Sequence, residues 1–310
     1  MRSLALVFAF ALFGCSSDES DAGPQNPGSS TAPVPFDSAG CTAPSLAPGA
    51  NPTLQIEHEG QTRSFILYVP QGIDPAKPNP MTVNWHGLTS NAGQQQAYAG
   101  NAIADERKTI VAYPEGLGNS FNGGVCCSNL GNPPHSADDV GFGKAIVAEV
   151  ARQICVDKRR VYSTGMSNGG YMSEHNGCFA ADFYAAVAPV SALGMARADC
   201  PASRPITIVS FNGTEDPLVS YAVSQQSMAG WVTRNGCSGD PERTPYGGSY
   251  CDTWKTCKAG VIVKACTITG MNHCWPGNPL VLPGFCASGG LSDMDANQIM
   301  YDVLQTMVLP

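Results

Sequence analysis

Short apolar stretches alternate along the chain with segments whose apolar positions recur at helical spacing. Most of the apolar stretches end at glycine, proline or polar residues, which is typical of buried strands. They cover residues 81–85, 109–113, 161–164, 185–188, 206–211 and 261–267. Before them, residues 54–57 and 63–69 lie on either side of Gly60 and predict an opening hairpin.

Helical segments make up the other half of the pattern. They fall near residues 94–107, 139–154, 168–179, 218–235 and 295–307. After Asp139, for example, Val140, Ile146 and Val150 repeat on roughly one helix face. Strands that alternate with helices favour a mostly parallel sheet of about eight strands with helices on both faces. In that architecture, reactive side chains lie on loops at the carboxyl ends of the strands.

The first 15 residues lack this alternation and predict a targeting segment. Arg2 precedes an apolar run at residues 4–13, which is too short to span a bilayer and is typical of a signal peptide. The run ends in Leu-Phe-Gly-Cys, which resembles a bacterial lipobox and makes Cys15 the predicted lipidation site. The alternative is an ordinary cleaved signal with an incidental cysteine. Either way, the predicted location is secreted: anchored by lipid to the outer membrane and cell surface, or otherwise extracellular or periplasmic.

Composition divides the rest of the chain in two. Residues 16–40 are rich in Ser, Pro, Gly, Ala and Asp and cannot bury a core, so they predict a flexible tether. Residues 41–310 show no repeat or second shift in composition, and we expect one domain there. The net charge of -8 attracts neither nucleic acid nor an anionic membrane, so the only membrane contact we expect is through the lipid.

Cysteine content agrees with export. The chain has 13 cysteines, and assigning Cys15 to lipid leaves an even set. In an oxidising compartment we expect these to form disulfides, although the sequence cannot choose their connectivity. No Cys-x-x-Cys pair occurs, so no metal site is expected.

Gly-Met-Ser-Asn-Gly at residues 165–169 matches the Gly-x-Ser-x-Gly pattern. In this pattern the serine sits on a tight strand-to-helix turn, and small neighbours let the strand and helix approach each other. A predicted strand precedes Ser167 and a predicted helix follows it, as the pattern requires. Ser167 is therefore the candidate nucleophile of an acyl-transfer site.

A serine nucleophile needs a histidine base and an acid, each after a later strand. Of the two histidines that follow Ser167, His175 lies within the next helix, whereas His273 directly follows the strand at 261–267. His273 is the predicted base. The strand at 206–211 leads to Glu215 and Asp216, and Asp216 is the predicted acid with Glu215 as the alternative.

The developing oxyanion needs preorganised N–H donors. One is the backbone N–H of Asn168, and the other should come from Leu88 or Thr89, after the strand at 81–85. His86 is expected to be a scaffold residue near the site and not the base, and we take His86 and Trp275 as candidate substrate contacts. Two acidic residues that precede the nucleophile, Asp138 and Asp139, are expected to cap a helix instead.

Together these segments resemble a family of secreted α/β-hydrolase esterases that groups polyhydroxybutyrate depolymerases with feruloyl and acetyl xylan esterases. The matching pieces are Trp-His-Gly at 85–87, Asp-Asp-Val-Gly-Phe at 138–142, Arg-Val-Tyr at 160–162, Gly-Met-Ser-Asn-Gly-Gly at 165–170, Asn-Gly-Thr-Glu-Asp at 212–216 and His-Cys-Trp-Pro-Gly at 273–277. The resemblance implies an α/β-hydrolase fold and ester hydrolysis through an acyl-enzyme, with no cofactor.

Three functions follow from these patterns. The first is a serine carboxylesterase that releases feruloyl or acetyl groups from plant polysaccharide such as xylan. The second is a depolymerase of polyhydroxyalkanoate or its oligomers. The third is a non-catalytic surface binding protein on a hydrolase scaffold, which the intact Ser167, Asp216 and His273 argue against. We expect a monomer whose partner is the ester substrate.

Overall fold

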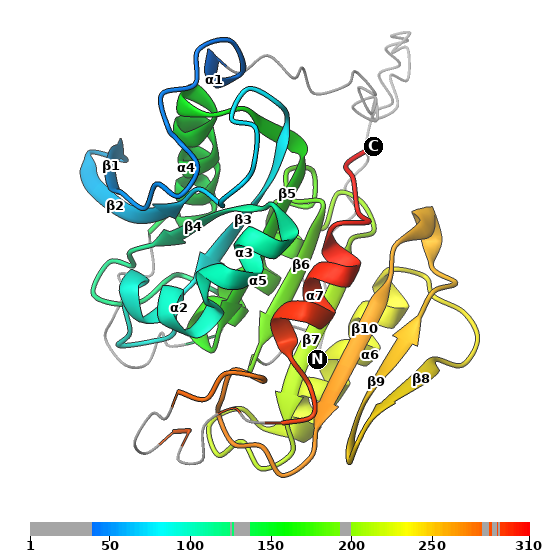
Figure 1. The fold of residues 1–310 in the computed structure, drawn as a ribbon. Helices are drawn as coiled ribbons and strands as arrows, with labels where there is room; N and C mark the ends of the chain where they lie inside the picture. Colours follow the sequence, from blue (N-terminus) through cyan, green and yellow to red (C-terminus); the bar gives the residue numbers. More distant parts are fainter. Residues whose placement is uncertain are drawn as a thin grey trace, which may run out of the picture. The chain divides into compact units, whose positions relative to one another are not determined.

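The computed structural model describes residues 39–124, 126, 137–192, 200–280, 285–286, 290 and 292–310, all within one unit of the chain. Its strands are β1 (Thr53–His58), β2 (Gln61–Tyr68), β3 (Asn79–Trp85), β4 (Ile110–Pro114), β5 (Val156–Met166), β6 (Ala186–Val190), β7 (Thr207–Gly213), β8 (Glu242–Tyr246), β9 (Ser249–Trp254) and β10 (Val263–Ile268). They form a ten-stranded sheet in the order β1-β2-β4-β3-β5-β6-β7-β10-β9-β8 (Figure 1).

The centre of this sheet is parallel and its two ends are antiparallel. Strands β4, β3, β5, β6, β7 and β10 run in one direction. The predicted opening hairpin of β1 and β2 is confirmed, and it joins the sheet antiparallel to β4. Because the central strands are parallel, their carboxyl ends lie along one edge of the sheet, where the loops that carry candidate chemistry begin.

Helices cover both faces of the sheet. They are α1 (Ala39–Thr42), α2 (Ala92–Ala99), α3 (Asn101–Arg107), α4 (Asp139–Gln153), α5 (Asn168–Phe179), α6 (Tyr221–Arg234) and α7 (Ala296–Leu304), with a short 3-10 helix at Lys258–Gly260. One apolar cluster joins α2, α3 and α7 to the sheet, and a second joins α4, α5 and α6 to it (Figure 1). In β7, Ile208 belongs to the second cluster and Val209 to the first, because successive strand residues point to opposite faces.

The helix predicted over residues 94–107 is interrupted. Gly100, with a φ of 72°, ends α2 and starts α3. Such a left-handed φ costs glycine little, whereas the apolar spacing on either side reads as one continuous helix. The predicted helix over residues 139–154 is observed as α4, and Asp138 caps it by accepting the N–H of Gly141.

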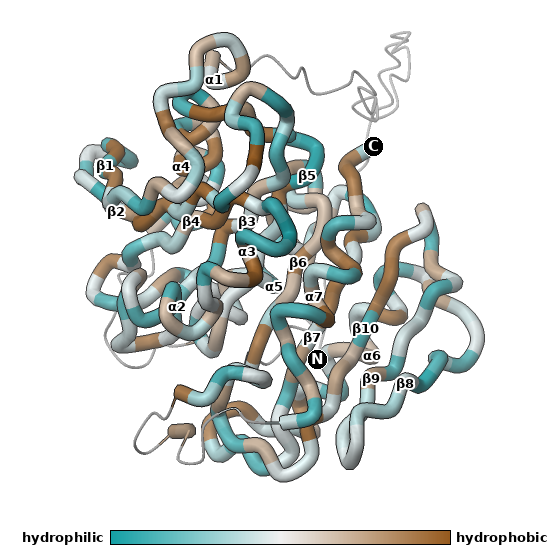
Figure 2. Tube along the Cα trace, in the orientation of Figure 1, coloured by the Kyte–Doolittle hydropathy of each residue, from teal (hydrophilic) through white to brown (hydrophobic). Residues whose placement is uncertain are grey.

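The sheet has ten strands and not about eight as predicted, because the apolar pattern did not predict the β8–β9 hairpin. Both strands are short and carry many polar side chains, and Figure 2 shows teal to pale colours along β8. They therefore lack the apolar run by which the central strands were found. The Gly-Gly turn at residues 247–248 was the available signal for a hairpin.

Five disulfides lie among the described residues. They join Cys41 to Cys155, Cys178 to Cys200, Cys237 to Cys257, Cys251 to Cys266, and Cys274 to Cys286. Cys126 is also disulfide-bonded. This many disulfides in one chain is typical of proteins that are exported to an oxidising compartment.

The predicted signal peptide, the lipidation site at Cys15 and most of the predicted tether lie outside the described residues. Helix α1 begins at Ala39, just before the predicted start of the domain at Cys41. Gly40 is packed so closely on Ile154 that a Cβ atom would lie 2.3 Å from the Ile154 nitrogen. Among the helices that the structure describes, none is long and apolar enough to cross a membrane.

Candidate active site

Ser167 occupies a sharp turn between β5, which ends at Met166, and α5, which begins at Asn168. Its φ of 55° and ψ of -122° lie outside the regions that non-glycine residues ordinarily occupy. Backbone hydrogen bonds hold this conformation, because the Ser167 N–H donates to the Val190 carbonyl at 2.9 Å. Strained backbone of this kind concentrates at functional sites, where the surrounding structure maintains it.

The glycines around Ser167 are required by close packing. A Cβ atom on Gly165 would lie 2.5 Å from the Trp85 carbonyl oxygen, and one on Gly169 would lie 2.0 Å from the same atom. A Cβ on Gly170 would lie 2.7 Å from that of Ala192. The serine turn can therefore approach the end of β3 only with glycine at positions 165 and 169, which is the physical reason for the Gly-x-Ser-x-Gly pattern.

Asp216 and His273 form a buried pair on the loops after β7 and β10. The His273 Nδ1 donates to Asp216 Oδ2 at 2.8 Å, and the two side chains are 5% and 1% exposed. The other carboxylate oxygen of Asp216 accepts the backbone N–H groups of Leu218 and Val219, both at 2.9 Å. The neighbouring Glu215 is exposed, so the geometry favours Asp216 over Glu215 as the acid.

Adjacent strands bring these loops together. Strands β7 and β10 are parallel neighbours, and a Cβ atom on Gly213 would lie 2.1 Å from the Met271 carbonyl oxygen. Ser191, directly after β6, donates its hydroxyl to the Cys274 carbonyl at 3.1 Å. Since the Ser167 N–H binds the carbonyl of Val190, the serine turn and the histidine loop share a support at the end of β6.

The loop after β3 passes beside the serine. A Cβ atom on Gly87 would lie 3.4 Å from that of Ser167. The Thr89 N–H already donates to the Asn119 carbonyl at 2.9 Å, whereas no hydrogen bond of the Leu88 N–H occurs among the described residues. Leu88 is therefore better placed than Thr89 to supply the second N–H donor. Asn168, the predicted first donor, begins α5, where backbone N–H groups have no partner within the helix.

The side chain of Asn168 has a role that sequence reasoning missed. It is fully buried, and its Oδ1 accepts the Phe121 N–H at 2.7 Å while its Nδ2 donates to the Phe121 carbonyl at 2.9 Å. The Ser120 hydroxyl also donates to Oδ1 at 3.2 Å. Residue 168 is a free position of the Gly-x-Ser-x-Gly pattern, so the pattern does not predict this contact.

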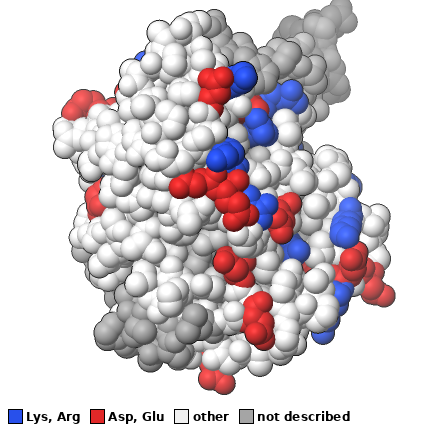
Figure 3. All heavy atoms as spheres, in the orientation of Figure 1, with Lys and Arg blue, Asp and Glu red and all other residues white. Residues whose placement is uncertain are grey.

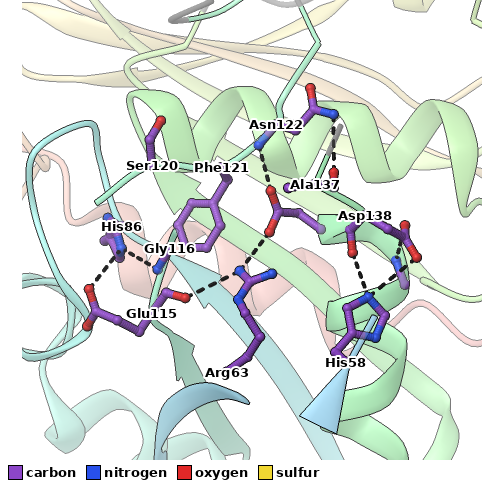
Figure 4. A network of polar contacts seen from close by, with 12 residues as sticks. His58, Arg63, His86, Glu115, Gly116, Ser120, Phe121, Asn122, Ala137 and Asp138 are labelled. Carbon is purple, nitrogen blue, oxygen red and sulfur yellow. Dashed lines mark hydrogen bonds and ion pairs between the residues drawn. The ribbon is translucent and has the colours of Figure 1, made fainter. Parts of the chain in front are cut away.

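His86 and Trp275 are not placed as substrate contacts. Both side chains are buried, at 0% and 1% exposure, so neither offers surface to a substrate. The His86 Nδ1 donates to the Gly87 carbonyl at 2.7 Å. Its Nε2 accepts the Gly116 N–H at 3.0 Å (Figure 4). Burial lowers the pKa of His86 to about 4, although its hydrogen bond to Gly87 acts in the opposite direction. The ring is therefore neutral at pH 7, even with a Glu115 oxygen 3.6 Å from Nε2.

Fold and site together define a class. A mostly parallel sheet between two helical layers carries a strained serine turn after β5, an acid after β7 and a histidine after β10. This is the α/β-hydrolase fold. A ferulic acid esterase from Anaeromyces mucronatus, solved in complex with ferulic acid, shares it with a TM-score of 0.55 at 15% identity, over 84% of this chain and 92% of that chain. No protein-family profile matches the chain.

Sequence comparison places the chain more narrowly. Feruloyl esterase B of Piromyces equi is 34% identical over 237 residues, which are 68% of this chain and 42% of that protein. Feruloyl esterase D of Neurospora crassa is 29% identical over 64% of this chain and 69% of its own length. Poly(3-hydroxyalkanoate) depolymerase C of Paucimonas lemoignei is 24% identical over 74% of this chain and 63% of its own length. The chain thus groups with the α/β-hydrolase proteins that include feruloyl esterases and a polyhydroxyalkanoate depolymerase.

Proposed function

We propose that this protein is a secreted serine carboxylesterase that hydrolyses feruloyl or acetyl esters of plant polysaccharide. The observation that carries the proposal is the buried hydrogen bond between Asp216 and His273, on the loops of adjacent strands at the sheet edge where Ser167 sits on its strained turn. A histidine that is oriented by a carboxylate activates a nearby serine hydroxyl, and the activated serine attacks the carbonyl carbon in acyl transfer.

In the proposed reaction, His273 takes the Ser167 proton as the Oγ attacks the ester carbonyl. Asp216 holds the His273 tautomer that leaves Nε2 free to accept this proton, and it stabilises the imidazolium that forms. The N–H groups of Asn168 and Leu88 bind the oxyanion of the tetrahedral intermediate. His273 then returns the proton to the leaving alkoxide, and water hydrolyses the acyl-enzyme by the same steps.

The names of the relatives support the choice of substrate. Two of them are feruloyl esterases, and a bifunctional acetylxylan esterase/xylanase of Neocallimastix patriciarum is 25% identical over 69% of this chain. A polyester substrate is the second candidate, favoured by the similarity to the Paucimonas lemoignei depolymerase. Both substrates are neutral esters and would use the same residues.

Side-by-side assays separate the candidates. Methyl ferulate, acetylated xylan and a hydroxybutyrate trimer are given to the full protein and to Ser167→Ala at equal concentration. We expect turnover of methyl ferulate or acetylated xylan well above that of the trimer. We also expect Ser167→Ala to keep the fold but lose more than about 95% of turnover, because covalent catalysis is lost. Preferential turnover of the trimer would support the depolymerase, and no turnover of any ester would support the binding protein.

The N-terminal segment completes the proposal. Lipid on Cys15 would hold the enzyme at the outer membrane, residues 16–40 would act as a tether, and residues 41–310 would form the catalytic domain, which we expect to be monomeric. The disulfides and the resemblance of the first 15 residues to a lipoprotein signal support this arrangement.

A further inference from the structure

A buried ion pair lies outside the triad. The Arg63 Nη2, on β2, is 2.8 Å from Asp139 Oδ1, at the start of α4, and the two side chains are 3% and 1% exposed. The Arg63 guanidinium also stacks 3.8 Å from the centre of the Phe142 ring. Taking two charges out of water costs free energy that their attraction only roughly offsets, so a buried pair is weak evidence for stability. Its other contacts indicate what it does instead.

Both members of the pair bind the backbone of one segment, residues 115–122. The second carboxylate oxygen of Asp139 accepts the Asn122 N–H at 2.7 Å, and the Arg63 Nη2 donates to the Glu115 carbonyl at 3.4 Å. In Figure 4 the guanidinium of Arg63 points to the backbone carbonyl of Glu115. The N–H of Asn122 points to the carboxylate of Asp139, next to this guanidinium. The ion pair therefore holds both ends of the 115–122 segment.

The first half of the 115–122 segment supports the loop after β3. The Gly116 N–H donates to His86 Nε2, and the Asn119 carbonyl accepts the Thr89 N–H. The Asn119 side chain donates to the Ser90 carbonyl at 2.8 Å. These contacts lie on both sides of Leu88, which carries one proposed oxyanion donor.

The second half of the 115–122 segment supports the other donor. Phe121 exchanges two hydrogen bonds with the Asn168 side chain, and Ser120 adds a third. The segment is itself tightly folded, because a Cβ atom on Gly116 would lie 2.4 Å from the Ser120 carbonyl oxygen. The 115–122 segment thus contacts the neighbours of Leu88 and the side chain of Asn168.

We propose that Arg63 and Asp139 are positioning residues for the oxyanion hole, acting through the 115–122 segment that spaces the N–H groups of Leu88 and Asn168. This inference rests on the proposed esterase function. Neither residue touches the reacting atoms. Oxyanion donors must lie about 2.7–3.1 Å from the oxyanion, so a small shift of the segment weakens stabilisation of the transition state and leaves ground-state binding nearly unchanged.

The main test variant is the double substitution Arg63→Met with Asp139→Leu in the full protein. Replacing a buried ion pair by apolar side chains of similar size is often neutral for stability, so the variant should fold, yet it lacks the hydrogen bonds from the ion pair to Glu115 and Asn122. Asp139→Asn is the second variant, because it keeps an oxygen that can accept the Asn122 N–H. Asp138→Asn is the matched control. It removes a neighbouring charge, retains a residue that caps α4, and leaves the 115–122 segment held by the ion pair.

Each variant is assayed for hydrolysis of p-nitrophenyl acetate and for inhibition by a phenyl-substituted trifluoromethyl ketone. The Ser167 Oγ adds to the carbonyl carbon of this ketone, its proton moves to His273, and the carbonyl oxygen becomes an anion in the hole. We expect the double variant to lose about tenfold or more in kcat, with KM changed less than about twofold and inhibitor affinity reduced by a similar factor to kcat. Asp139→Asn should show a smaller loss in the same parameters, and Asp138→Asn should match the unaltered protein.

Two results would overturn the proposal. One is a folded double variant, or a folded Asp139→Asn if the double variant does not fold, with unaltered kcat and inhibitor affinity. The other is a loss of kcat without a loss of inhibitor affinity. Failure of the esterase function would be distinct from either, because the unaltered protein would then hydrolyse no ester.

Discussion

Asp216 and Glu215 are neighbours in the sequence and carry the same functional group, yet their environments differ. Asp216 is buried against His273 and accepts two backbone N–H groups, whereas Glu215 is exposed. The strand-end position predicted Asp216 as the acid with Glu215 as the alternative, but the sequence does not show which of the two carboxylates is buried. That choice depends on which side chain the loop turns toward β10, which is a property of the folded loop.

Asp216→Asn should lower kcat on p-nitrophenyl acetate about 100-fold or more, because an amide can hold the wrong tautomer of His273. Glu215→Gln is the matched control and should change kcat less than about twofold. Steady-state kinetics of both variants at pH 8 measure the difference. A larger loss in Glu215→Gln than in Asp216→Asn would mean that the acid is misassigned.

Burial of His86 makes the stability of the fold depend on pH. Burial holds its pKa near 4, below the ordinary value of 6.5, so between these pH values the unfolded chain binds a proton that the folded chain does not. Stability due to neutral His86 is therefore complete above about pH 6.5 and is lost as the pH falls toward 4, by about 3 kcal/mol. Glu115, which faces the ring, would favour the protonated form, but burial outweighs it.

Replacing His86 by glutamine should remove this part of the pH dependence, because glutamine does not titrate. Urea unfolding of the unaltered protein and of His86→Gln at pH 7 and at pH 4.5 measures it. The free energy of unfolding should fall by about 2–3 kcal/mol more in the unaltered protein than in His86→Gln. Equal falls in the two proteins would show that His86 is not the group responsible.

At the scale of elements, the central strands were predictable and the edges were not. Strands such as β6 and β7 are buried throughout, so β6 is a continuous apolar run in the sequence and β7 a largely apolar one. Strand β9 alternates between buried and half-buried positions, and the β8 strand that pairs with it is largely exposed, so propensity alone did not reveal them. The break between α2 and α3 depends on the left-handed conformation of Gly100, which the spacing of apolar residues does not predict.

The disulfide between β9 and β10 is expected to help hold the His273 loop, because that loop directly follows β10. Cys251 and Cys266 close a loop with a sequence separation of 15. Replacing both by serine should lower the free energy of unfolding by about 3 kcal/mol, because the unfolded chain gains conformational freedom. Thermal unfolding and residual activity after heating measure the effect.

Replacing Cys237 and Cys257 by serine is the control, since that bridge closes a loop of similar size but joins no residue of β10. It should cost similar stability but leave kcat unchanged. If both pairs of substitutions lower kcat equally, the β9–β10 bridge has no particular role in holding the His273 loop.

At the scale of the whole molecule, charge is sparse and mixed. Charged residues are 14% of the chain, and on the face covered by α3 and α7 both signs lie in one band (Figure 3). Arg107 pairs there with Glu106 and Asp302. No field of one sign covers this face, so membrane attachment is expected to depend on lipid and not on charge.

A Cys15→Ser variant made in the native host should therefore lose membrane association, measured by centrifugation of washed membranes. A chain starting at Ala39 should keep full activity on p-nitrophenyl acetate, because the described site lies C-terminal to it. Continued sedimentation of Cys15→Ser with membranes would exclude lipidation there. A folded but inactive truncated chain would show that residues before Ala39 contribute to the site.

The antiparallel hairpin at one end of the sheet has a further consequence. Strand β8 is an edge strand, so its outer backbone groups are open to pairing with another chain. It contains Pro245, and its Glu242 and Arg243 pair with Lys255 and Asp252. A proline and solvated charges are known obstacles to intermolecular strand addition. If the protein is exported as proposed, no cytosolic chaperone acts on it after export, and these features of β8 should lower its tendency to aggregate there.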